Sequence, residues 1–333
     1  MKRMSIFFFA CLTSLTTACA EQKNFGESSG LFFVRVNSKY GYIDRTGKTI
    51  ITPQFDVAMP FSEELAAVKV GDDWGYIDKT GKYVIDPQFD WASQFSEGLA
   101  GVMISGKCGY IDKSGKIVIY PQYDLAIGFT GGLTPVRVSG KWGYIDKAGN
   151  YVINPQYDGA KVFAEGLASV EVEGKWGFID QTGNYVVNPQ FDYPDFNFTS
   201  GFFAEGLAAV KVGDKWGYID KSGKIVINPQ FDEAGWFADG LADVQVGGKW
   251  GYINKKGETV INLQFDRAGQ FTEGLAIVAT GGKYGCIDKS GKIVINPQFE
   301  SVFPFSDGLA LVLMGTKHGY IDKKGKFVWN PTD

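Results

Sequence analysis

Histidine and cysteine are scarce in this chain of 333 residues. It has one histidine, His318, and four cysteines, of which Cys11 and Cys19 lie near the N-terminus. No pair of these residues has metal-ligand spacing, and a Ser-His-Asp triad would have to include His318. The other two cysteines, Cys108 and Cys286, are too few for a disulfide scaffold. We therefore predict that the protein is not an enzyme and has no metal site and no cofactor.

The chain also lacks a strong charge of either sign and a long hydrophobic run. Its formal net charge is −4, and the first 20 residues contain the positive charges of Lys2 and Arg3 and no negative charge. A mildly acidic protein is a poor candidate for nucleic-acid binding. The single apolar run, residues 4–15, is too short to span a bilayer as a helix.

The N-terminus has the pattern of a secretory signal peptide over residues 1–20, followed by a short linker, 21–29. Two basic residues precede the apolar run, and small residues follow it. Ala18-Cys19-Ala20 fits cleavage after Ala20, whereas "LTTAC" is similar to a bacterial lipobox and predicts lipidation of Cys19. Both alternatives predict an extracytoplasmic protein, either periplasmic or secreted, or held at the membrane only through a lipid anchor at Cys19.

What the chain has in abundance is repetition. The segment "KWGYIDKSGKIVINPQFDEAGWF" (215–237) has close copies along most of the sequence. The glycine of "GYID" recurs at 34-residue steps, with one step of 40, at Gly41, Gly75, Gly109, Gly143, Gly177, Gly217, Gly251, Gly285 and Gly319. This predicts one repeat domain, residues 30–333, with nine units, a truncated last unit and an insertion near 193–203.

Each unit contains three strand signals, which predict a three-stranded antiparallel meander. "GLAAVKV" (206–212) alternates with a period of two, and "KWGYID" (215–220) follows after a tight turn. "DKSG" then connects to the third signal, "KIVI" (224–227), with glycine in the left-handed position of the turn. The aspartate that begins this turn recurs in eight units and is replaced by Asn254 in the seventh, which favours a turn role over a calcium ladder.

Aromatic residues recur at fixed positions of the unit. A phenylalanine stands in every connection between units, and we interpret it as a plug buried between neighbouring meanders. A tryptophan before the "GYID" glycine has the same structural interpretation, and it stands at Trp74, Trp142, Trp176, Trp216 and Trp250.

The recurring "KWGYID", "PQFD" and "EGLA" resemble the bacterial WG-repeat family over residues 30–333. The resemblance implies a tandem β-rich repeat protein, often exported, for which binding or scaffolding is presumed. It supplies no catalytic residue. The Trp position departs from the pattern at Tyr40, Cys108, Tyr284 and His318.

The repeats predict an all-β fold in which 34-residue meanders stack as an open superhelical array. The chain starts with the first strand of a unit and stops after the third strand of another, so neither end supplies a strand that the other lacks. A closed, propeller-like toroid is the alternative. In an open stack Cys108 and Cys286 are far apart, which predicts two free thiols, buried and protected until the protein is denatured.

Charged and variable positions provide candidates for a binding surface. Lysines at the hairpin tips and acidic residues in the connections predict an electrically two-sided molecule. A position in the first strand varies between units, and the insertion gathers aromatic residues in one loop. The candidate binding residues are Arg35, Lys69, Arg137, Lys211, Tyr193, Phe196, Phe198 and Phe202.

These observations favour a non-enzymatic binding or scaffold protein that presents a repeated β surface to an unknown protein or cell-envelope polymer. The alternative is a glycan-acting or glycan-binding protein of the cell envelope. Glycan cleavage requires two carboxylates on either side of one bond, whereas the carboxylates here repeat uniformly along the chain.

Overall fold

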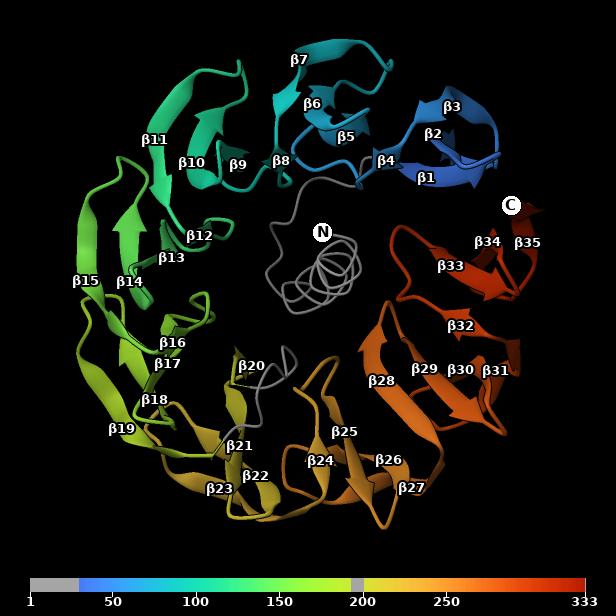
Figure 1. Cartoon of the computed structure of the whole chain (residues 1–333). Coiled ribbons are helices and arrows are strands. Elements are labelled where there is room, and N and C mark those ends of the chain that lie inside the picture. Colours follow the sequence, from blue (N-terminus) through green and yellow to red (C-terminus); the bar gives the residue numbers. More distant parts are fainter. Residues whose placement is uncertain (1–29, 193–200, 333) are drawn as a thin grey trace. The chain divides into compact units, whose positions relative to one another are not determined.

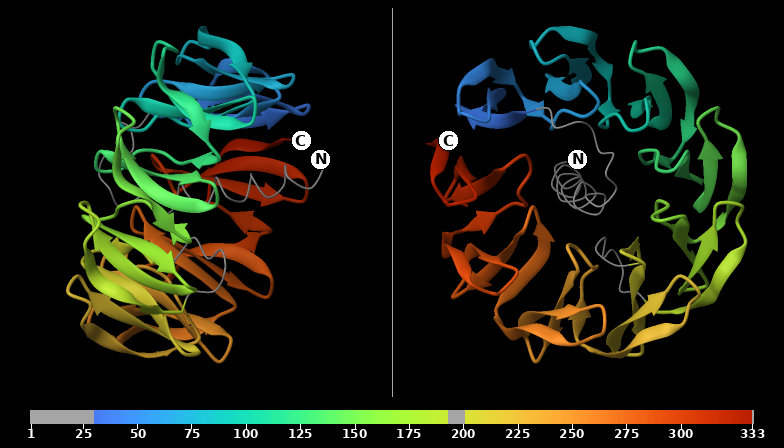
Figure 2. Two further views of the ribbon diagram at one scale, coloured as in Figure 1. Left: turned by 60° about the vertical axis from the view of Figure 1, so that its left-hand side comes forward. Right: turned by 180° about the vertical axis from the view of Figure 1, so that it is seen from behind.

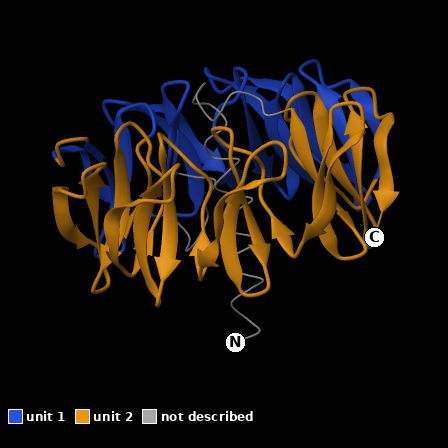
Figure 3. Ribbon diagram, turned by 90° about the horizontal axis from the view of Figure 1, so that it is seen from above, with its two compact units in different colours: residues 1–25, 164–180, 184–298 blue, residues 26–163, 181–183, 299–333 orange. Residues whose placement is uncertain are grey.

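The computed structural model describes residues 30–192 and 201–332. The chain divides into two compact units, shown in different colours in Figure 3. Unit 1 contains residues 164–180 and 184–298, and unit 2 contains residues 26–163, 181–183 and 299–333. The signal peptide, Cys19 and the linker 21–29 lie outside the described residues, so those predictions stay as they were.

The described residues form nine antiparallel sheets, numbered here along the chain (Figure 1). The first four sheets are β1 (Leu31–Val36), β2 (Lys39–Asp44) and β3 (Thr49–Phe55); β4 (Val57–Ala58), β5 (Ala66–Val70), β6 (Asp73–Ile77) and β7 (Tyr83–Phe89); β8 (Trp91–Ala92), β9 (Leu99–Ile104), β10 (Lys107–Asp112) and β11 (Ile117–Tyr123); and β12 (Leu125–Ala126), β13 (Leu133–Val138), β14 (Lys141–Asp146) and β15 (Tyr151–Tyr157). The next three are β16 (Gly159–Ala160), β17 (Leu167–Val172), β18 (Lys175–Asp180) and β19 (Tyr185–Phe191); β20 (Phe203–Ala204), β21 (Leu207–Val212), β22 (Lys215–Asp220) and β23 (Ile225–Phe231); and β24 (Glu233–Ala234), β25 (Leu241–Val246), β26 (Lys249–Asn254) and β27 (Thr259–Phe265). The last two are β28 (Arg267–Thr272), β29 (Leu275–Thr280), β30 (Lys283–Asp288) and β31 (Ile293–Phe299); and β32 (Ser301–Val302), β33 (Leu309–Met314), β34 (Lys317–Asp322) and β35 (Phe327–Thr332).

Eight of these sheets have four strands, so the predicted three-stranded unit was incomplete. The connection between units contributes a short additional strand that pairs with the first strand of the next meander, as β4 pairs with β5. This strand is only two residues long in most sheets, which is too short for the alternating pattern that reveals a strand in sequence. Sheet 1, with three strands, is the exception among the described residues.

The glycine of each "GYID" is required by a close approach of backbone. The register between β22 and β23 shifts around Gly217, because three residues of β23 bulge across from this one residue. A Cβ at Gly217 would lie 2.5 Å from the carbonyl oxygen of Ile227 and 2.7 Å from the nitrogen of Pro229. Only glycine leaves room for such an approach, which explains why this position does not vary.

The aromatic plugs between sheets are confirmed. The ring of Phe95, in the connection to sheet 3, lies 4.8 Å from the ring of Tyr76 in sheet 2, and both side chains are fully buried. The hydroxyl of Tyr76 donates to the carbonyl oxygen of Ser93 in the same connection, at 2.7 Å. The other stacked pairs are Tyr42 with Phe61, Tyr110 with Phe129, Tyr144 with Phe163, Phe178 with Phe203, Tyr218 with Phe237 and Tyr252 with Phe271.

The first and last sheets pack against each other inside unit 2, as the views in Figures 1 and 2 show. The rings of Phe32 and Tyr320 are 5.4 Å apart, and Arg45 forms an ion pair with Asp307 at 3.0 Å. An open array leaves the outer faces of its terminal units uncovered. The predicted open superhelix is therefore corrected, because the closed alternative fits these contacts better.

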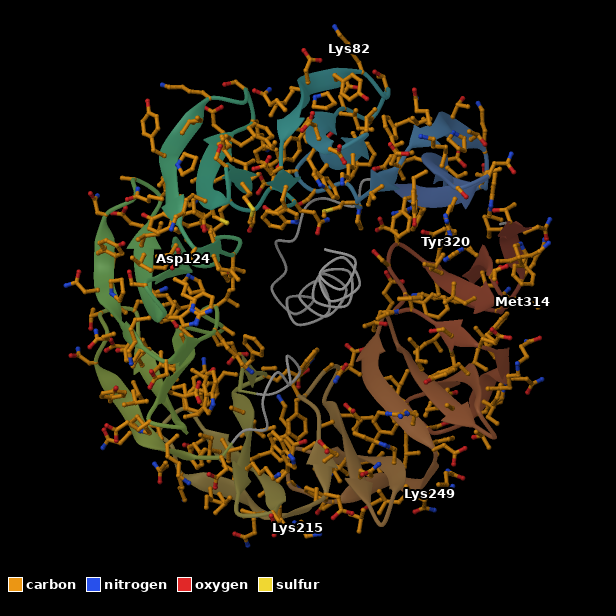
Figure 4. The ribbon with its side chains drawn as sticks, in the orientation of Figure 1. Lys82, Asp124, Lys215, Lys249, Met314 and Tyr320 are labelled. Carbon is orange, nitrogen blue, oxygen red and sulfur yellow. The ribbon has the colours of Figure 1, made fainter. Side chains whose placement is uncertain are left out.

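In the part of the chain that the structure describes, side chains occupy the place beside β1 where the other sheets have a short strand. In sheet 2 the amide groups of Asp56 and Met59, which flank β4, donate to the carbonyl oxygens of Lys69 and Ala67. The corresponding carbonyl oxygens of Arg35 and Phe33 in β1 instead accept the hydroxyl groups of Thr332 (2.8 Å) and Tyr320 (2.9 Å). Tyr320 is labelled in Figure 4.

Two further expectations can be compared with the described residues. Cys108 and Cys286 are both buried and free, as predicted, and burial raises the pKa of Cys286 to about 12. Their protection from thiol reagents stays a prediction. Within residues 30–192 and 201–332, no helix has the length and apolar character needed to cross a membrane.

Candidate functional site

The variable positions of the repeat lie together at one end of each sheet. We call this the first-hairpin end, because the turn between the first two strands of the meander is there. In sheet 2, Val57 pairs with Lys69, and Lys69 pairs in turn with Trp74. Residues directly opposite each other in a sheet point to the same face, so the two variable positions are neighbours in space. The sequence had singled out both positions but could not show that they meet.

We define the variable row as the first-strand position together with the partner that the short strand supplies. Its cross-strand pairs are Val57 with Lys69, Trp91 with Met103, Leu125 with Arg137, Glu233 with Gln245, Arg267 with Ala279 and Ser301 with Leu313. Arg35 in β1 and Lys211 in β21 occupy the first-strand position of their sheets, opposite Tyr40 and Trp216. Most of these side chains are half-buried or exposed, and Ala279 is buried.

Charged residues that recur in most repeats at the first-hairpin end are paired with each other. Lys39 at the start of β2 forms an ion pair with Asp56 at 2.6 Å, and the other oxygen of Asp56 accepts the amide of Gly71 at 2.8 Å. These hydrogen bonds, with the Lys39 bond as the largest cause, lower the pKa of Asp56. The same pairing joins Lys107 with Asp124, Lys141 with Asp158, Lys175 with Asp192, Lys215 with Asp232 and Lys249 with Asp266, and Figure 4 labels Asp124, Lys215 and Lys249. The lysine of "KWG" therefore has a structural role.

The basic residues of the variable row differ from these lysines. Among the described residues, Arg35, Lys69 and Arg137 form no direct ion pair. The charges of Lys69 and Arg137 still act at longer range on Asp56 and Asp124 and are minor causes of their lowered pKa values. The first-hairpin end of sheet 2 also has negative charges. Asp72 lies in the turn that follows β5, and Asp73 is the first residue of β6. The row in unit 2 is thus a mixed surface of unpaired charges and half-exposed apolar side chains, rather than a simple basic patch.

The opposite end of each sheet corrects the predicted two-sided charge distribution. There the connection acid and a hairpin lysine meet: Glu97 binds Lys147 at 3.0 Å and accepts the amide groups of Gly131 and Gly132. Equivalent pairs are Lys113 with Glu63, Lys221 with Glu165, Lys255 with Glu205 and Lys289 with Asp239. The two rows that the sequence placed on separate sides neutralise each other, because successive repeats bring the hairpin tip of one next to the connection of another.

The connection acids also have strained backbones. Glu97 has a φ of 53°, a left-handed conformation that is unusual for a residue other than glycine. Its carboxylate, held by the two amides and Lys147, offsets that strain. The role of Glu97 is therefore to join one repeat to another, and its presence does not require a ligand.

The turn aspartates are also structural, as predicted. Asp78 accepts the amides of Thr80 and Lys82 and the hydroxyl of Thr80 through one oxygen. Asn254 accepts the amides of Lys256 and Glu258 in the same way. No group of three or more histidine, cysteine or acidic side chains suited to a metal ion occurs among the described residues.

The predicted aromatic sites have mixed outcomes. Trp74 and Trp216 are buried, which agrees with a packing role, whereas Trp142, Trp176 and Trp250 are half-buried beside the variable row. Phe202 is 8% exposed, so the prediction that it contacts a ligand is corrected: its ring is part of the interior. The other insertion residues, Tyr193, Phe196 and Phe198, lie outside the described residues.

The sequence did not reveal a buried acid in unit 1. Asp243 in β25 is 4% exposed, and its Oδ1 has no hydrogen-bond partner. Burial raises its pKa to about 7, although its own amide and the Gln270 side chain act in the opposite direction. The only signal was a charged residue where other repeats have small or apolar ones, such as Ala67 and Ala209.

The repeats match a known family in sequence. The family described as "WG containing repeat" matches residues 40–72, 74–108, 109–142, 142–176, 176–216, 216–250, 250–284 and 284–317. The chain belongs to the WG-repeat family. No curated protein matches this WG-repeat protein in sequence.

Solved structures resemble this WG-repeat protein in fold. A structure titled "Crystal structure of the eukaryotic initiation factor" matches with a TM-score of 0.63 and 11% identity, over 92% of this chain and 98% of that chain. The structure of dihydro-heme d1 dehydrogenase NirN in complex with DHE matches with a TM-score of 0.50 and 12% identity, over 96% of this chain and 76% of that chain. Likeness at such identity concerns the fold alone, and it supports a nine-bladed β-propeller in which each sheet is a blade.

Proposed function

We propose that this WG-repeat protein is a non-enzymatic binding or scaffold module whose ligand contacts the variable row. The observation that carries the proposal is a contrast at the first-hairpin end between charged residues that bind each other and charged residues that do not. Recurrent residues such as Lys39 and Asp56 bind each other directly, whereas Arg35, Lys69 and Arg137 form no direct ion pair among the described residues. A rigid scaffold with variable, accessible side chains is the usual construction of a recognition surface.

The ligand is an unknown protein or cell-envelope polymer outside the cytoplasm. The location rests on the N-terminal signal pattern alone. Half-exposed apolar side chains in the row, such as Trp91, Met103 and Leu125, favour a protein partner, because interfaces combine apolar anchors with a charged rim. A glycan ligand is the competing outcome, in which Trp91 and Trp142 would stack on sugar rings.

A matched pair of variants tests the role of the row. The triple variant Arg35→Ala, Lys69→Ala, Arg137→Ala removes three unpaired charges at the first-hairpin end. Its control, Lys48→Ala, Lys82→Ala, Lys116→Ala, removes three charges from the hairpins at the other end of sheets 1–3 and leaves the row intact; Lys82 is labelled in Figure 4. Both variants change the net charge equally.

Immobilised wild type and both variants would be exposed to envelope proteins and, separately, to envelope polysaccharides of the source cell. We expect one ligand to be retained by the wild type and the control and lost, by about tenfold or more, by the row variant. Equal retention by both variants would locate binding elsewhere. A loss restricted to polysaccharide would identify a glycan ligand.

A further inference from the structure

The chain's one histidine lies at the contact between the last sheet and the first. His318 in β34 pairs with Thr332 in β35, and the Thr332 hydroxyl donates to the carbonyl oxygen of Arg35 in β1 at 2.8 Å. The Nδ1 atom of His318 and the Nε atom of Arg35 are both buried, and neither has a hydrogen-bond partner. We call this contact between β34–β35 and β1 the seam. Buried polar atoms without partners are rare and often mark a functional group.

The surroundings of His318 disfavour its charged form. Burial is the larger cause that lowers the pKa of His318, and the positive charge of Arg35 is the second. Arg35 itself lies over the ring of Tyr40, 5.9 Å from its centre. Lys317 directly precedes His318 in β34. Among residues 30–192 and 201–332, no carboxylate contributes to the shift of the His318 pKa.

Two further basic side chains of sheet 1 form ion pairs. Lys39, beside Tyr40 in β2, is held by Asp56 at 2.6 Å. At the opposite end of the sheets, Arg45 binds Asp307 across the seam at 3.0 Å. That ion pair bridges the two sheets of the seam, and no hydrogen bond or ion pair of the described residues joins it to His318.

The seam also differs from the other sheet contacts in its covalent connection. Successive sheets along the chain are joined by a connection that becomes the short strand of the next sheet, as β4 joins sheets 1 and 2. No such segment runs from sheet 9 to sheet 1 among the described residues, and side chains such as Tyr320 and Thr332 hold them together. The seam can therefore separate without breaking a strand pairing.

We propose that the seam is an acid-sensitive latch, in which protonation of His318 beside Arg35 loosens the contact between the last and first sheets. At neutral pH the imidazole is uncharged, and it packs where tryptophan or tyrosine stands in most other repeats. When the imidazole takes up a proton, two positive charges share a partly desolvated interface. This inference concerns a conformational change and does not depend on the ligand of the variable row.

The direction of the pH dependence follows from linkage. The pKa of His318 is lower in the closed seam than in water, so the open form binds the proton more tightly. The stability that the neutral imidazole contributes is complete above its ordinary pKa of about 6.5 and is lost as pH falls below it. Because a single proton is taken up, the open population increases by at most about tenfold per pH unit.

Hydrogen exchange of the whole protein tests the latch. Exchange of the β1, β34 and β35 amides would be followed from about pH 7.5 to about pH 5, the range in which histidine titrates, and corrected with the rates of the unfolded chain. Strands β5 and β6 serve as the internal reference, because Trp74 occupies the corresponding position there. We expect wild-type protection at the seam to decrease with acid by several-fold more than protection of the reference strands.

Two variants identify the charges involved. His318→Tyr places at this position the residue that Tyr40 and Tyr284 supply in other repeats, and should remove the excess pH dependence. Arg35→Gln removes the opposing cation and should reduce it. The same dependence in His318→Tyr as in the wild type would overturn the proposal, and an unchanged dependence in Arg35→Gln would overturn the part assigned to Arg35. If His318→Tyr does not fold, His318→Gln provides the same comparison without the titrating group.

Discussion

At the scale of single residues, the structure separates positions that look alike in sequence. Some glycines serve a turn with positive φ, such as Gly223 (φ 84°), and others make room for the backbone of a neighbouring strand, such as Gly251. Acids divide in the same way. Most are paired or bound to backbone amides, whereas Asp243 is buried with one oxygen unsatisfied.

Asp243 should make the stability of the protein decrease as pH rises. Its pKa is about 7 in the folded protein and about 4 in an unfolded chain, so the folded state binds more protons between those values. We expect a loss approaching roughly 4 kcal/mol from pH 4 to above pH 7, measured by urea unfolding at several pH values. Asp243→Ala, which matches Ala67 and Ala209, should abolish this loss. A wild-type stability that does not fall over this range would contradict the assignment.

Replacement of a "GYID" glycine should be severely destabilising. In Gly251→Ala the added Cβ would lie 2.5 Å from the carbonyl oxygen of Ile261, and backbone atoms cannot move aside as a flexible side chain could. We expect a loss of about 3 kcal/mol or more in the free energy of unfolding, read from urea midpoints. Gly269→Ala is the control, because it has a single neighbour within 4 Å, at 3.9 Å. Equal effects of the two variants would show that the bulge over Gly251 is not rigid.

At the scale of elements, the unit of stability is the contact between one sheet and the connection to the next. Tyr76 and Phe95 combine a tilted aromatic contact with a hydrogen bond from the Tyr76 hydroxyl to the carbonyl oxygen of Ser93. The fifth sheet has Phe178 in place of the tyrosine, so it keeps the ring contact without the hydroxyl. Sheets 1 to 7 thus share the ring contact, and the hydroxyl is an addition to it, whereas sheet 8 has Cys286 at this position.

The two parts of this contact should be separable by mutation. Tyr76→Phe should cost about 1 to 2 kcal/mol, since a buried carbonyl loses its donor, and Phe95→Ala should cost about 3 to 5 kcal/mol through the cavity it leaves. Thermal and urea unfolding would measure both. Tyr120→Phe removes a hydroxyl from a side chain that is 74% exposed and should have no measurable effect. A larger cost for Tyr76→Phe than for Phe95→Ala would contradict this order.

At the scale of the whole molecule, the decisive contact is the one between the chain's first and last sheets inside unit 2. Tyr320 and Thr332 supply the donors that a fourth strand supplies elsewhere. The strand pattern of the first and last repeats does not predict this contact. The contact depends on carbonyl groups of β1 that pair with no strand among the described residues.

Removal of these two hydroxyls should weaken the closure. We expect Tyr320→Phe combined with Thr332→Val to cost about 2 kcal/mol and to increase hydrogen exchange in β1 at neutral pH. Thr52→Val, on the exposed side of β3, controls for the loss of a threonine hydroxyl. In an open array the double variant would exchange like the wild type, because the two sheets would not touch.

The sequence by itself determined the repeat, its period, the all-β class and the roles of the turn aspartates and buried aromatics. These features depend on local rules, alternation along a strand and the chemistry of a turn, and the chain repeats each of them often enough to be read. The short fourth strand escaped detection, because two residues such as Val57 and Ala58 carry no period.

Only the tertiary structure decided which repeated residues meet. Lys147 and Glu97 are 50 positions apart, and Tyr320 and Phe33 are 287 apart, so no local pattern relates them. The choice between an open and a closed array depends on the contact of the first and last sheets inside unit 2, which is made by side chains far apart in the sequence, such as Phe32 and Tyr320. The same contact brings the charge of Arg35 within reach of His318.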